Sequence, residues 1–599
     1  MKQFLLTFIA SFLMTMGYTQ NLTVSETGRY TDGRDGACEI ATFDEGTDRL
    51  FITNAASDSV DIVDISDPSS PGFVGGIDVL LYGGGVNSVV SLDNGFVAVA
   101  IEAEVKQDPG KIVFFDTDGT YETDVTVGAL PDMVTVTSDG NKVLVANEGE
   151  PDDDYVVDPD GSISIIDISG GIENLSQSDV TTLGFENAPT EITGALQKPG
   201  VSWSQDLEPE FVAINEDNTL AAVICQEANV LIFVDLDNDE ILSYKGLGFK
   251  DYSLAGNAFD ASNRDDAINI QNWDVKGVYQ PDAIASYTVG GETFFISANE
   301  GDGRDYDGYS SEVRIKDLTL DSMVFPDYAM LQEDENLGRL KSFTPDVIGD
   351  PDNDGEIEEL YSYGARSFTI WDDEGNLVWD SGNDIENYIK DNHPDFFNCD
   401  DGIADEKDER SDDKGPEPEA ATIGEIAGHY YAFIGLERQG GIMVYDITDP
   451  NAPVFETYIN SIDSDTTLID IPPEGLVFVP AANSPDGENL LIVSNEVSGT
   501  TTIYGIQSDL VSAKDISFQE SSVSVFPNPT SDKIQIKIDH FDFERTTYTM
   551  TNSIGSHVKN GLLTNAIQEL DLSSLANGVY YLTVQSEGAF TRTEKIVKY

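Results

Sequence analysis

Acidic residues recur in pairs along this chain, at a spacing that could hold a metal ion or a polar ligand between carboxylates. The clearest pair is Asp282 and Glu300, in the segments Pro281-Asp282-Ala283 and Asn299-Glu300-Gly301. In four of five such pairs, the spacing fits two antiparallel strands of roughly six residues joined by a turn. The five pairs, whose acids are 16 to 22 positions apart, are Asp132 and Glu148, Glu210 and Glu227, Asp282 and Glu300, Glu419 and Glu437, and Glu474 and Glu496.

Two weaker copies of the same hairpin pattern also occur. One begins at Glu39, and the other ends at Glu102. If the hairpins form a closed ring, the acids of every copy surround one opening. Carboxylates at that density must be protonated, paired with basic side chains or neutralised by a metal. The alternative is that each acid caps the turn of its own hairpin. We expect the opening to be lined by Glu39, Glu102, Asp132, Glu148, Glu210, Glu227, Asp282, Glu300, Glu419, Glu437, Glu474 and Glu496.

Basic residues are scarce, and several of them lie close to these acids in the sequence. Arg366, Lys414 and Arg438 are candidates for binding an anion beside a metal. A solvated loop of mixed charge would have a similar composition, so that interpretation stays open.

A second metal signal lies in the segment from Asp350 to Glu358. Its oxygen ligands fall at positions 1, 3, 5 and 9, with Gly355 at position 6, a spacing that lets a tight loop enclose Ca²⁺. The twelfth position is Tyr361, which excludes an EF-hand. We therefore expect a structural calcium ion, and the alternative is an ordinary acidic turn. The predicted ligands are Asp350, Asp352, Asp354 and Glu358.

The overall charge limits the partners. With 110 Asp and Glu against 31 Lys and Arg, the formal net charge is −79, which argues against nucleic acid or an anionic membrane surface as a partner. Cations are the natural partners. The three cysteines, Cys38, Cys225 and Cys399, show no metal-binding spacing. No nucleophile motif, phosphate-binding loop or His-rich metal site occurs in the sequence.

Short strand-like segments bounded by Gly, Asp, Asn and Pro recur from residue 38 to about 506. They include Val313 to Ile315 and Arg366 to Trp371, and together they make seven or eight units. Because such units cannot bury their faces singly, a closed ring is the stable arrangement. The sequence predicts an all-β chain with a β-propeller of seven or eight blades. Insertions are expected at about 171–208, 245–280 and 317–360.

The two ends of the chain differ from this middle part. Residues 1–19 have the pattern of a secretory signal peptide, and no later segment is long and apolar enough to cross a membrane. We expect the propeller over 20–507, a linker over 508–522 and a small β-sandwich over 523–599, which is nearly neutral and therefore a separate domain. The protein is expected to be exported and not integral to a membrane.

The last segment resembles the C-terminal sorting domain of the bacterial type IX secretion system. The resemblance rests on Val525-Phe526-Pro527-Asn528-Pro529, on Leu575 to Tyr581 and on the closing Lys595-Ile596-Val597-Lys598. It implies contact with that secretion machinery, passage through the periplasm and outer membrane, and then release or attachment at the cell surface.

The repeats resemble the choice-of-anchor I family of secreted and surface proteins over about residues 28–507. The resemblance rests on Asn147 to Glu150, Asn299 to Arg304, Tyr363 to Phe368, Arg410 to Glu419 and Leu436 to Tyr445. It implies a propeller-like domain joined to an anchoring tail, and no single activity. The acidic rings are also similar to those of calcium-dependent phosphatase and phytase propellers.

Three hypotheses about function follow. In the first, Ca²⁺ ions held by the ring carboxylates activate water for phosphate-ester hydrolysis, while Arg366, Arg438 or Lys414 binds the phosphate. In the second, the calcium is structural and the propeller face of a surface adhesion module binds a glycan or a protein. A lactonase-type propeller is a third hypothesis.

Overall fold

The computed structural model describes residues 22–464, 467–468, 470–508, 523–538, 546–553, 555–563, 565, 567–586 and 590–599. The chain forms two compact units, Met1–Leu510 and Val511–Tyr599. The expected signal peptide over 1–19, and the expected linker apart from Ser508, lie outside the described residues.

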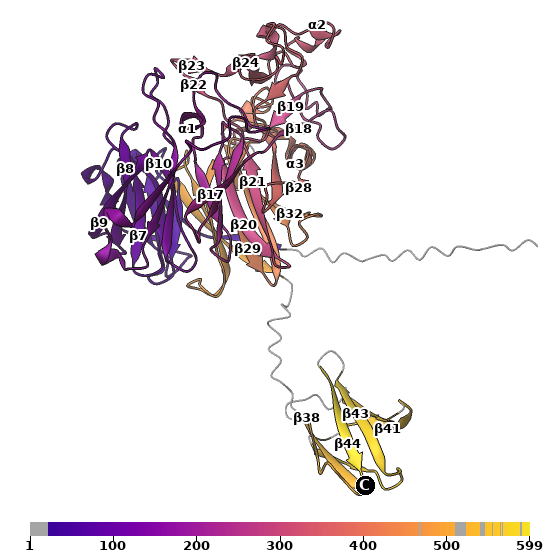
Figure 1. Ribbon diagram of the computed structural model, residues 1–599. Helices are drawn as coiled ribbons and strands as arrows, with labels where there is room; N and C mark the ends of the chain where they lie inside the picture. The colour runs from indigo at the N-terminus through magenta and orange to yellow at the C-terminus, as the bar shows by residue number, and fades with distance from the viewer. Residues whose placement is uncertain are drawn as a thin grey trace, which may run out of the picture. The chain divides into compact units, whose positions relative to one another are not determined.

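Within the described part of the first unit, seven four-stranded antiparallel sheets form the blades of a propeller (Figure 1). This confirms the predicted fold and fixes the blade number at seven. From the innermost strand outward, blades 1 to 4 are β2 (Ala41–Asp44), β3 (Arg49–Asn54), β4 (Ser59–Asp64) and β5 (Gly72–Asp78); β6 (Val86–Ser91), β7 (Phe96–Ile101), β8 (Pro109–Asp116) and β9 (Tyr121–Ala129); β10 (Pro131–Val136), β11 (Lys142–Asn147), β12 (Ser162–Asp167) and β13 (Val180–Gly184); and β14 (Phe211–Ile214), β15 (Leu220–Cys225), β16 (Val230–Asp235) and β17 (Glu240–Gly246). Blades 5 to 7 are β20 (Ala283–Val289), β21 (Glu292–Asn299), β27 (Ser367–Asp372) and β28 (Leu377–Asp380); β29 (Pro418–Ile426), β30 (His429–Leu436), β31 (Ile442–Asp446) and β32 (Val454–Ile459); and β35 (Pro473–Val479), β36 (Asn489–Asn495), β37 (Thr500–Ser508) and β1 (Leu22–Thr31).

The ring is closed by the first strand of the chain. β1 is the outermost strand of blade 7 and pairs with β37, from Leu22 opposite Ser508 to Thr31 opposite Thr500. Each innermost strand contacts the innermost strand of the next blade, and β35 contacts β2. Closure therefore joins the two ends of the unit and leaves no blade without two neighbours.

The core lies between blades and follows from the apolar middle strands. β15 has five fully buried residues from Ala221 to Cys225, because both of its faces are covered. Val223 packs in one cluster with Leu144 and Ile163 of the preceding blade. Burial raises the pKa of the Cys399 thiol to about 12, and all three cysteines are free and buried. These thiols therefore act as small apolar core side chains.

All long insertions leave the ring on one face, here called the upper face. Since antiparallel strands alternate in direction, loops after the second and fourth strands emerge where the innermost strand begins. The long loops cover 185–210, 247–282, 300–366 and 381–417. They carry α1 (Trp203–Asp206), β18 (Phe249–Asp251), β19 (Lys276–Val278), β22 (Asp305–Tyr306), β23 (Tyr309–Ser310), β24 (Glu312–Arg314), α2 (Tyr328–Leu331), β25 (Lys341–Phe343), β26 (Tyr361–Ser362) and α3 (Asp384–Asn392).

Loops 247–282 and 300–366 together form a cap with its own apolar core, which includes Tyr252, Phe259 and Leu340. Figure 1 shows α1, α2 and β22 to β24 on one side of the ring. Val313 to Ile315 belongs to this cap and to no blade, which corrects our assignment of that segment. The expected insertion at 171–208 begins later, because Val180–Gly184 is the outer strand of blade 3.

The second unit is a small β-sandwich, as predicted. One sheet contains β38 (Val523–Phe526), β39 (Lys533–Ile538) and β42 (Ile567–Asp571), and the other β41 (His557–Leu562), β40 (Thr546–Asn552), β43 (Gly578–Ser586) and β44 (Phe590–Lys598). Ile536, Met550 and Leu582 fill the space between the sheets. In neither unit does the described part of the chain contain a helix that is long and apolar enough to span a membrane.

Candidate functional site

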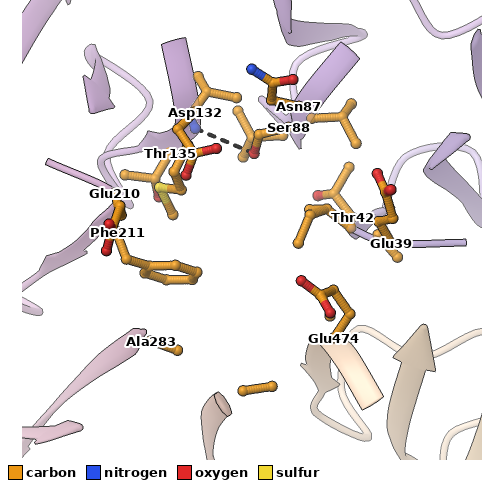
Figure 2. Close-up of a pocket in the computed structure, with 18 of the residues that line it drawn as sticks. Glu39, Thr42, Asn87, Ser88, Asp132, Thr135, Glu210, Phe211, Ala283 and Glu474 are labelled. Carbon is orange, nitrogen blue, oxygen red and sulfur yellow. Dashed lines mark hydrogen bonds between the residues drawn. The ribbon is translucent and has the colours of Figure 1, made fainter. Parts of the chain in front are cut away.

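Seven equivalent positions at the start of the innermost strands surround the upper mouth of the propeller. Six of them are acidic, and the seventh is Asn87 of blade 2. We call this set the inner ring: Glu39, Asn87, Asp132, Glu210, Asp282, Glu419 and Glu474. Six of its members, all except Glu419, line a central cavity of about 440 Å³. Figure 2 shows Glu39, Asn87, Asp132, Glu210 and Glu474 around that cavity.

Several inner-ring residues occupy β-bulges. Pro131 pairs with Asn147 and Met133 with Ala146, so Asp132 between them has no residue opposite. The same register shift leaves Asn87, Glu474 and Glu419 unpaired in their blades. A bulge turns one side chain away from the regular alternation of a strand, and here it marks positions at the mouth. The proline before each of three bulges fits the first position of a strand, because it has no N–H to donate to the ladder.

A second set of acids follows the second strand of six blades, as the hairpin spacing predicted. This outer ring consists of Glu102, Glu148, Glu227, Glu300, Glu437 and Glu496. In blades 3 and 5 a buried asparagine fixes the strand end before the acid. The amide of Asn147 donates to Ser164 Oγ at 3.0 Å, and that of Asn299 donates to Thr369 Oγ1 at 2.8 Å.

Burial and mutual repulsion raise the pKa values of most inner-ring acids. Burial, with Glu496 and Glu474 nearby, raises the pKa of Glu39 to about 8. The pKa of Asp132 and that of Glu474 rise to about 7 for the same reasons. Those of Glu210, Asp282 and Glu419 also lie well above the usual range, again chiefly because of burial. Without bound cations, these groups therefore retain protons near neutral pH.

On the side of blades 5 and 6, fixed cations balance the acids. Lys414 Nζ pairs with Glu300 and lies 3.4 Å from Glu417, and Arg410 Nε lies 2.6 Å from Glu417. Burial opposes ionisation of Glu417, yet Lys414 and Arg410 outweigh it and hold its pKa at about 2. Oxygens of Glu300, Glu417 and Glu437 all lie within 4.8 Å of one another. Glu417 was not among the predicted site residues, although its position three residues after Lys414 was a usable signal.

Arg438 lies at the edge of the same group. Its guanidinium contacts Glu437 and Asp401, each at 2.8 Å, and its side chain is 35% exposed. Of the three expected anion-binding residues, it is the most accessible.

On the side of blades 3 to 5, the acids form the wall of an open pocket of about 340 Å³, which we call the vestibule. Its lining contains eight carboxylates and neither Lys nor Arg: Asp132, Glu148, Glu150, Glu210, Glu227, Asp282, Asp302 and Asp305, together with Gln226, Gly303 and Tyr306. Lys106, whose side chain is 55% exposed, lies 3.7 Å from Glu150 at the edge. Four lining residues were not predicted from the sequence, because they lie on insertions and loops outside the repeat: Glu150, Asp302, Asp305 and Tyr306.

Glu227 presents a buried carboxylate oxygen to the vestibule. It is 7% exposed, and its Oε2 has no hydrogen-bond partner in the described part of the chain. Arg304, behind it, is committed to two other buried acids, Asp206 at 3.1 Å and Glu208 at 3.6 Å. A buried carboxylate oxygen without a donor is costly, so this wall suits a bound cation.

The structure gives Arg366 a different setting from the anion-binding role that we expected. Its guanidinium is buried and donates to Glu386 Oε1 at 2.8 Å and to the carbonyl oxygens of Asp260, Ser411 and Asp413 at 2.7 to 2.8 Å. These contacts connect blade 5 to α3 and to two insertions. The guanidinium is therefore occupied by the protein itself.

The expected calcium loop lies in the cap. Carboxylate oxygens of Asp350, Asp352 and Glu358 lie within 4.8 Å of one another. Asp354 is outside that group, and its Oδ1 accepts from the Glu356 N–H at 2.9 Å. Gly355 has a φ of +91°, so the sharp bend occurs where the sequence placed it.

Comparison with known proteins supplies two family matches. Residues 39–450 match the family described as Choice-of-anchor I domain, and residues 524–599 match Secretion system C-terminal sorting domain. Gigasin-3a of Magallana gigas is 29% identical over 196 residues, which are 30% of this chain and 67% of that protein. The Mesenchyme-specific cell surface glycoprotein of Strongylocentrotus purpuratus is 26% identical over 321 residues, which are 45% of this chain and 40% of that protein.

Similar solved structures include Kuenenia stuttgartiensis Hydrazine Synthase, at 13% identity and a TM-score of 0.40, covering 79% of this chain and 98% of that one. The β-propeller domain of Myceliophteria thermophila Cps50 (Swd1) has 8% identity and a TM-score of 0.39, covering 82% and 100%.

The raised pKa values predict how stability depends on pH when metal is removed by a chelator. Glu39 and Glu474 bind more protons folded than unfolded between about pH 4.5 and 8, so stability is highest below that window and falls as pH rises through it. Glu474→Gln removes one of the two acids and should raise the free energy of unfolding at pH 8 by about 1–2 kcal/mol, with little change at pH 5. Denaturant unfolding at both pH values measures this. The exposed Glu104→Gln is the control, and an equal effect of the two variants would contradict the assignment.

Proposed function

This chain belongs to the choice-of-anchor I domain family, and from that premise we propose that its propeller is a calcium-binding surface module whose vestibule holds the ion. The type IX sorting domain at its C-terminus directs export to the cell surface or the medium and engages the secretion machinery. The propeller therefore works outside the cell.

The observation that supports the proposal is the acidic wall of the vestibule. Eight carboxylates line it without Lys or Arg, and a buried oxygen of Glu227 lacks a donor in the described part of the chain. Calcium prefers six to eight oxygen ligands and tolerates irregular geometry, which suits carboxylates from several blades. Asp132, Glu148 and Glu227 are the central candidates, and Glu210 and Asp282 complete the wall.

Ligand binding fits the surroundings of the site better than hydrolysis. Lys414 is paired with Glu300 and Glu417, and Arg366 is buried against Glu386. A phosphate arriving at the vestibule therefore meets excess negative charge and has no unpaired cation in the lining.

Phosphate-ester hydrolysis is the second candidate, and one observation favours it. The guanidinium of Arg438, 35% exposed, lies beside Glu437 at the edge of the carboxylate cluster, where it could contact an ion-bound phosphate.

We expect no turnover of p-nitrophenyl phosphate by the purified propeller, with calcium or with chelator, because the cations near the site are already paired. A colorimetric assay checks this. Hydrolysis that requires calcium and disappears in Arg438→Met would establish the second candidate instead.

Glu227→Gln should weaken calcium binding by at least about tenfold, because it replaces a carboxylate with an amide, a weaker ligand for Ca²⁺. Isothermal titration of the metal-free protein measures the affinity, in a chain that also carries Asp352→Ala so that the cap loop does not contribute. Glu425→Gln is the matched control, because Glu425 is exposed and lies at the end of β29 away from the mouth. Absence of calcium binding in the parent chain would refute the vestibule site.

The cap loop should bind a separate, structural calcium ion. An ion that binds only the folded loop stabilises it by about 2.7 kcal/mol at a hundredfold excess over Kd. Calcium should therefore raise the melting temperature, and Asp352→Ala should remove most of that rise. Glu356→Ala, an exposed acid of the same loop outside the ligand group, is the control. Coincident melting curves with calcium and with chelator would show that the loop is only an acidic turn.

A further inference from the structure

The central cavity beneath the inner ring has a layered lining. The residue after each inner-ring position also lines the cavity, and it lies one step deeper because the innermost strands run away from the mouth. In this second layer, only the serine is polar. The second layer consists of Ile40, Ser88, Met133, Phe211, Ala283, Ala420 and Gly475. A rim of carboxylates therefore lies directly above an apolar belt.

The second layer leaves room beside one aromatic ring. Phe211 of blade 4 is only partly buried, and Figure 2 shows its ring extending into the cavity between Glu210 and Ala283. The next three blades contribute small residues at the same level, namely Ala283, Ala420 and Gly475. An apolar group of a ligand can therefore lie against the ring without displacing a side chain.

The acids of the rim lack fixed cations. In the described part of the chain, none of the five acids that line the cavity forms an ion pair with Lys or Arg. Lys414, a basic side chain near Asp282, is already paired with Glu300 and Glu417. Glu419, the sixth acid of the inner ring, is 8% exposed, and its Oε2 has no hydrogen-bond partner among the described residues. The mouth thus offers acceptors without matching donors.

The two layers together match one class of ligand. A hydrated metal ion gains nothing from the apolar belt, a neutral aromatic molecule leaves the carboxylates without a counter-charge, and an anion is repelled. An organic ammonium meets both layers, because its N–H groups donate to the acids while its apolar body packs beside Phe211. The cavity volume of about 440 Å³ lies within the roughly 300–1,000 Å³ typical of small-molecule sites.

We propose that the central cavity binds a small organic cation, a primary ammonium carried on an aryl or alkyl body, with its ammonium group at the inner ring and its body against Phe211. The inference goes beyond the calcium site, because Glu39, Glu474 and Phe211 line the central cavity and not the vestibule.

Isothermal titration of the metal-free protein at about pH 8.5, where alkyl ammonium groups keep their charge, tests the proposal. Metal is removed because Asp132, Glu210 and Asp282 line both the cavity and the vestibule. 2-Phenylethylammonium and hexylammonium are the probes. Each should bind at least about tenfold more tightly than methylammonium, which lacks the apolar body. The phenylethyl probe should exceed 2-phenylethanol, which lacks the charge, by the same factor, and 3-phenylpropanoate should not bind.

Variants of Phe211 test the apolar contact. Phe211→Ala should weaken 2-phenylethylammonium by at least about tenfold. Phe211→Leu keeps the packing of β14, so it serves if the alanine variant does not fold. It should weaken the aryl probe by at least about threefold and leave hexylammonium within about twofold. Phe73→Ala is the control, because Phe73 is 58% exposed on the outer strand of blade 1, and it should change neither affinity.

Variants of the rim separate this proposal from the calcium site. The double variant Glu39→Gln/Glu474→Gln removes two charges from the cavity and none from the lining of the vestibule. It should weaken 2-phenylethylammonium by at least about tenfold and leave calcium affinity within about threefold. Glu104→Gln/Glu425→Gln, at two exposed acids, is the charge-matched control.

The outcomes are distinguishable. Calcium binding without binding of either ammonium probe overturns the cavity proposal and leaves the calcium site standing, whereas the reverse result overturns the calcium site alone. Equal binding of 2-phenylethanol or of methylammonium, or unchanged affinity in both Phe211 variants, also overturns the cavity proposal.

Discussion

Repulsion between carboxylates at one mouth is the constraint on which the rest of this propeller depends. Ring closure brings the first residues of seven innermost strands together, and six of the seven are acidic. Burial further increases the free energy needed to ionise these groups, and the pKa values of Glu39, Asp132 and Glu474 are therefore raised. The two sides of the mouth differ in whether basic side chains offset this repulsion. On one side the chain supplies Lys414, Arg410 and Arg438, whereas the described residues that line the vestibule include neither Lys nor Arg.

The acids and the side chains that surround them come from different parts of the sequence. The blades supply the acids through a repeated bulge and a repeated strand end. The insertions supply what differs between the two sides: Arg410 and Lys414 lie on 381–417, while Arg304 and Tyr306 lie on 300–366. Because these insertions all leave the upper face, they can cover or complete the mouth without disturbing the strand pairing below. A regular scaffold thereby carries an irregular site.

This division explains what could be predicted from the sequence. The seven-fold repeat and the ring of acids follow from local spacing, so the fold and the positions of Asp132 or Asp282 were predictable. The partners of the basic residues were not, because Lys414 meets Glu300 across 114 positions. The partners of Arg366 were unpredictable for the same reason, because its contacts with Asp260 and Ser411 form only when the insertions are folded. Val313 to Ile315 has strand composition, yet nothing local says that its partner is β25 of the cap and not a blade.

A divalent cation at the vestibule would compete with protons for the same oxygen atoms. The pKa of Asp132 is about 7, chiefly because of burial and then because of Glu150, so this group holds a proton for part of the time near neutral pH. A divalent ion binds only the ionised form, and its binding releases that proton. Protonation would therefore lower the repulsion at the empty mouth under acid conditions, and a bound divalent cation would lower it at higher pH. In both states the repulsion is relieved without a fixed cation, which leaves the vestibule open for a ligand.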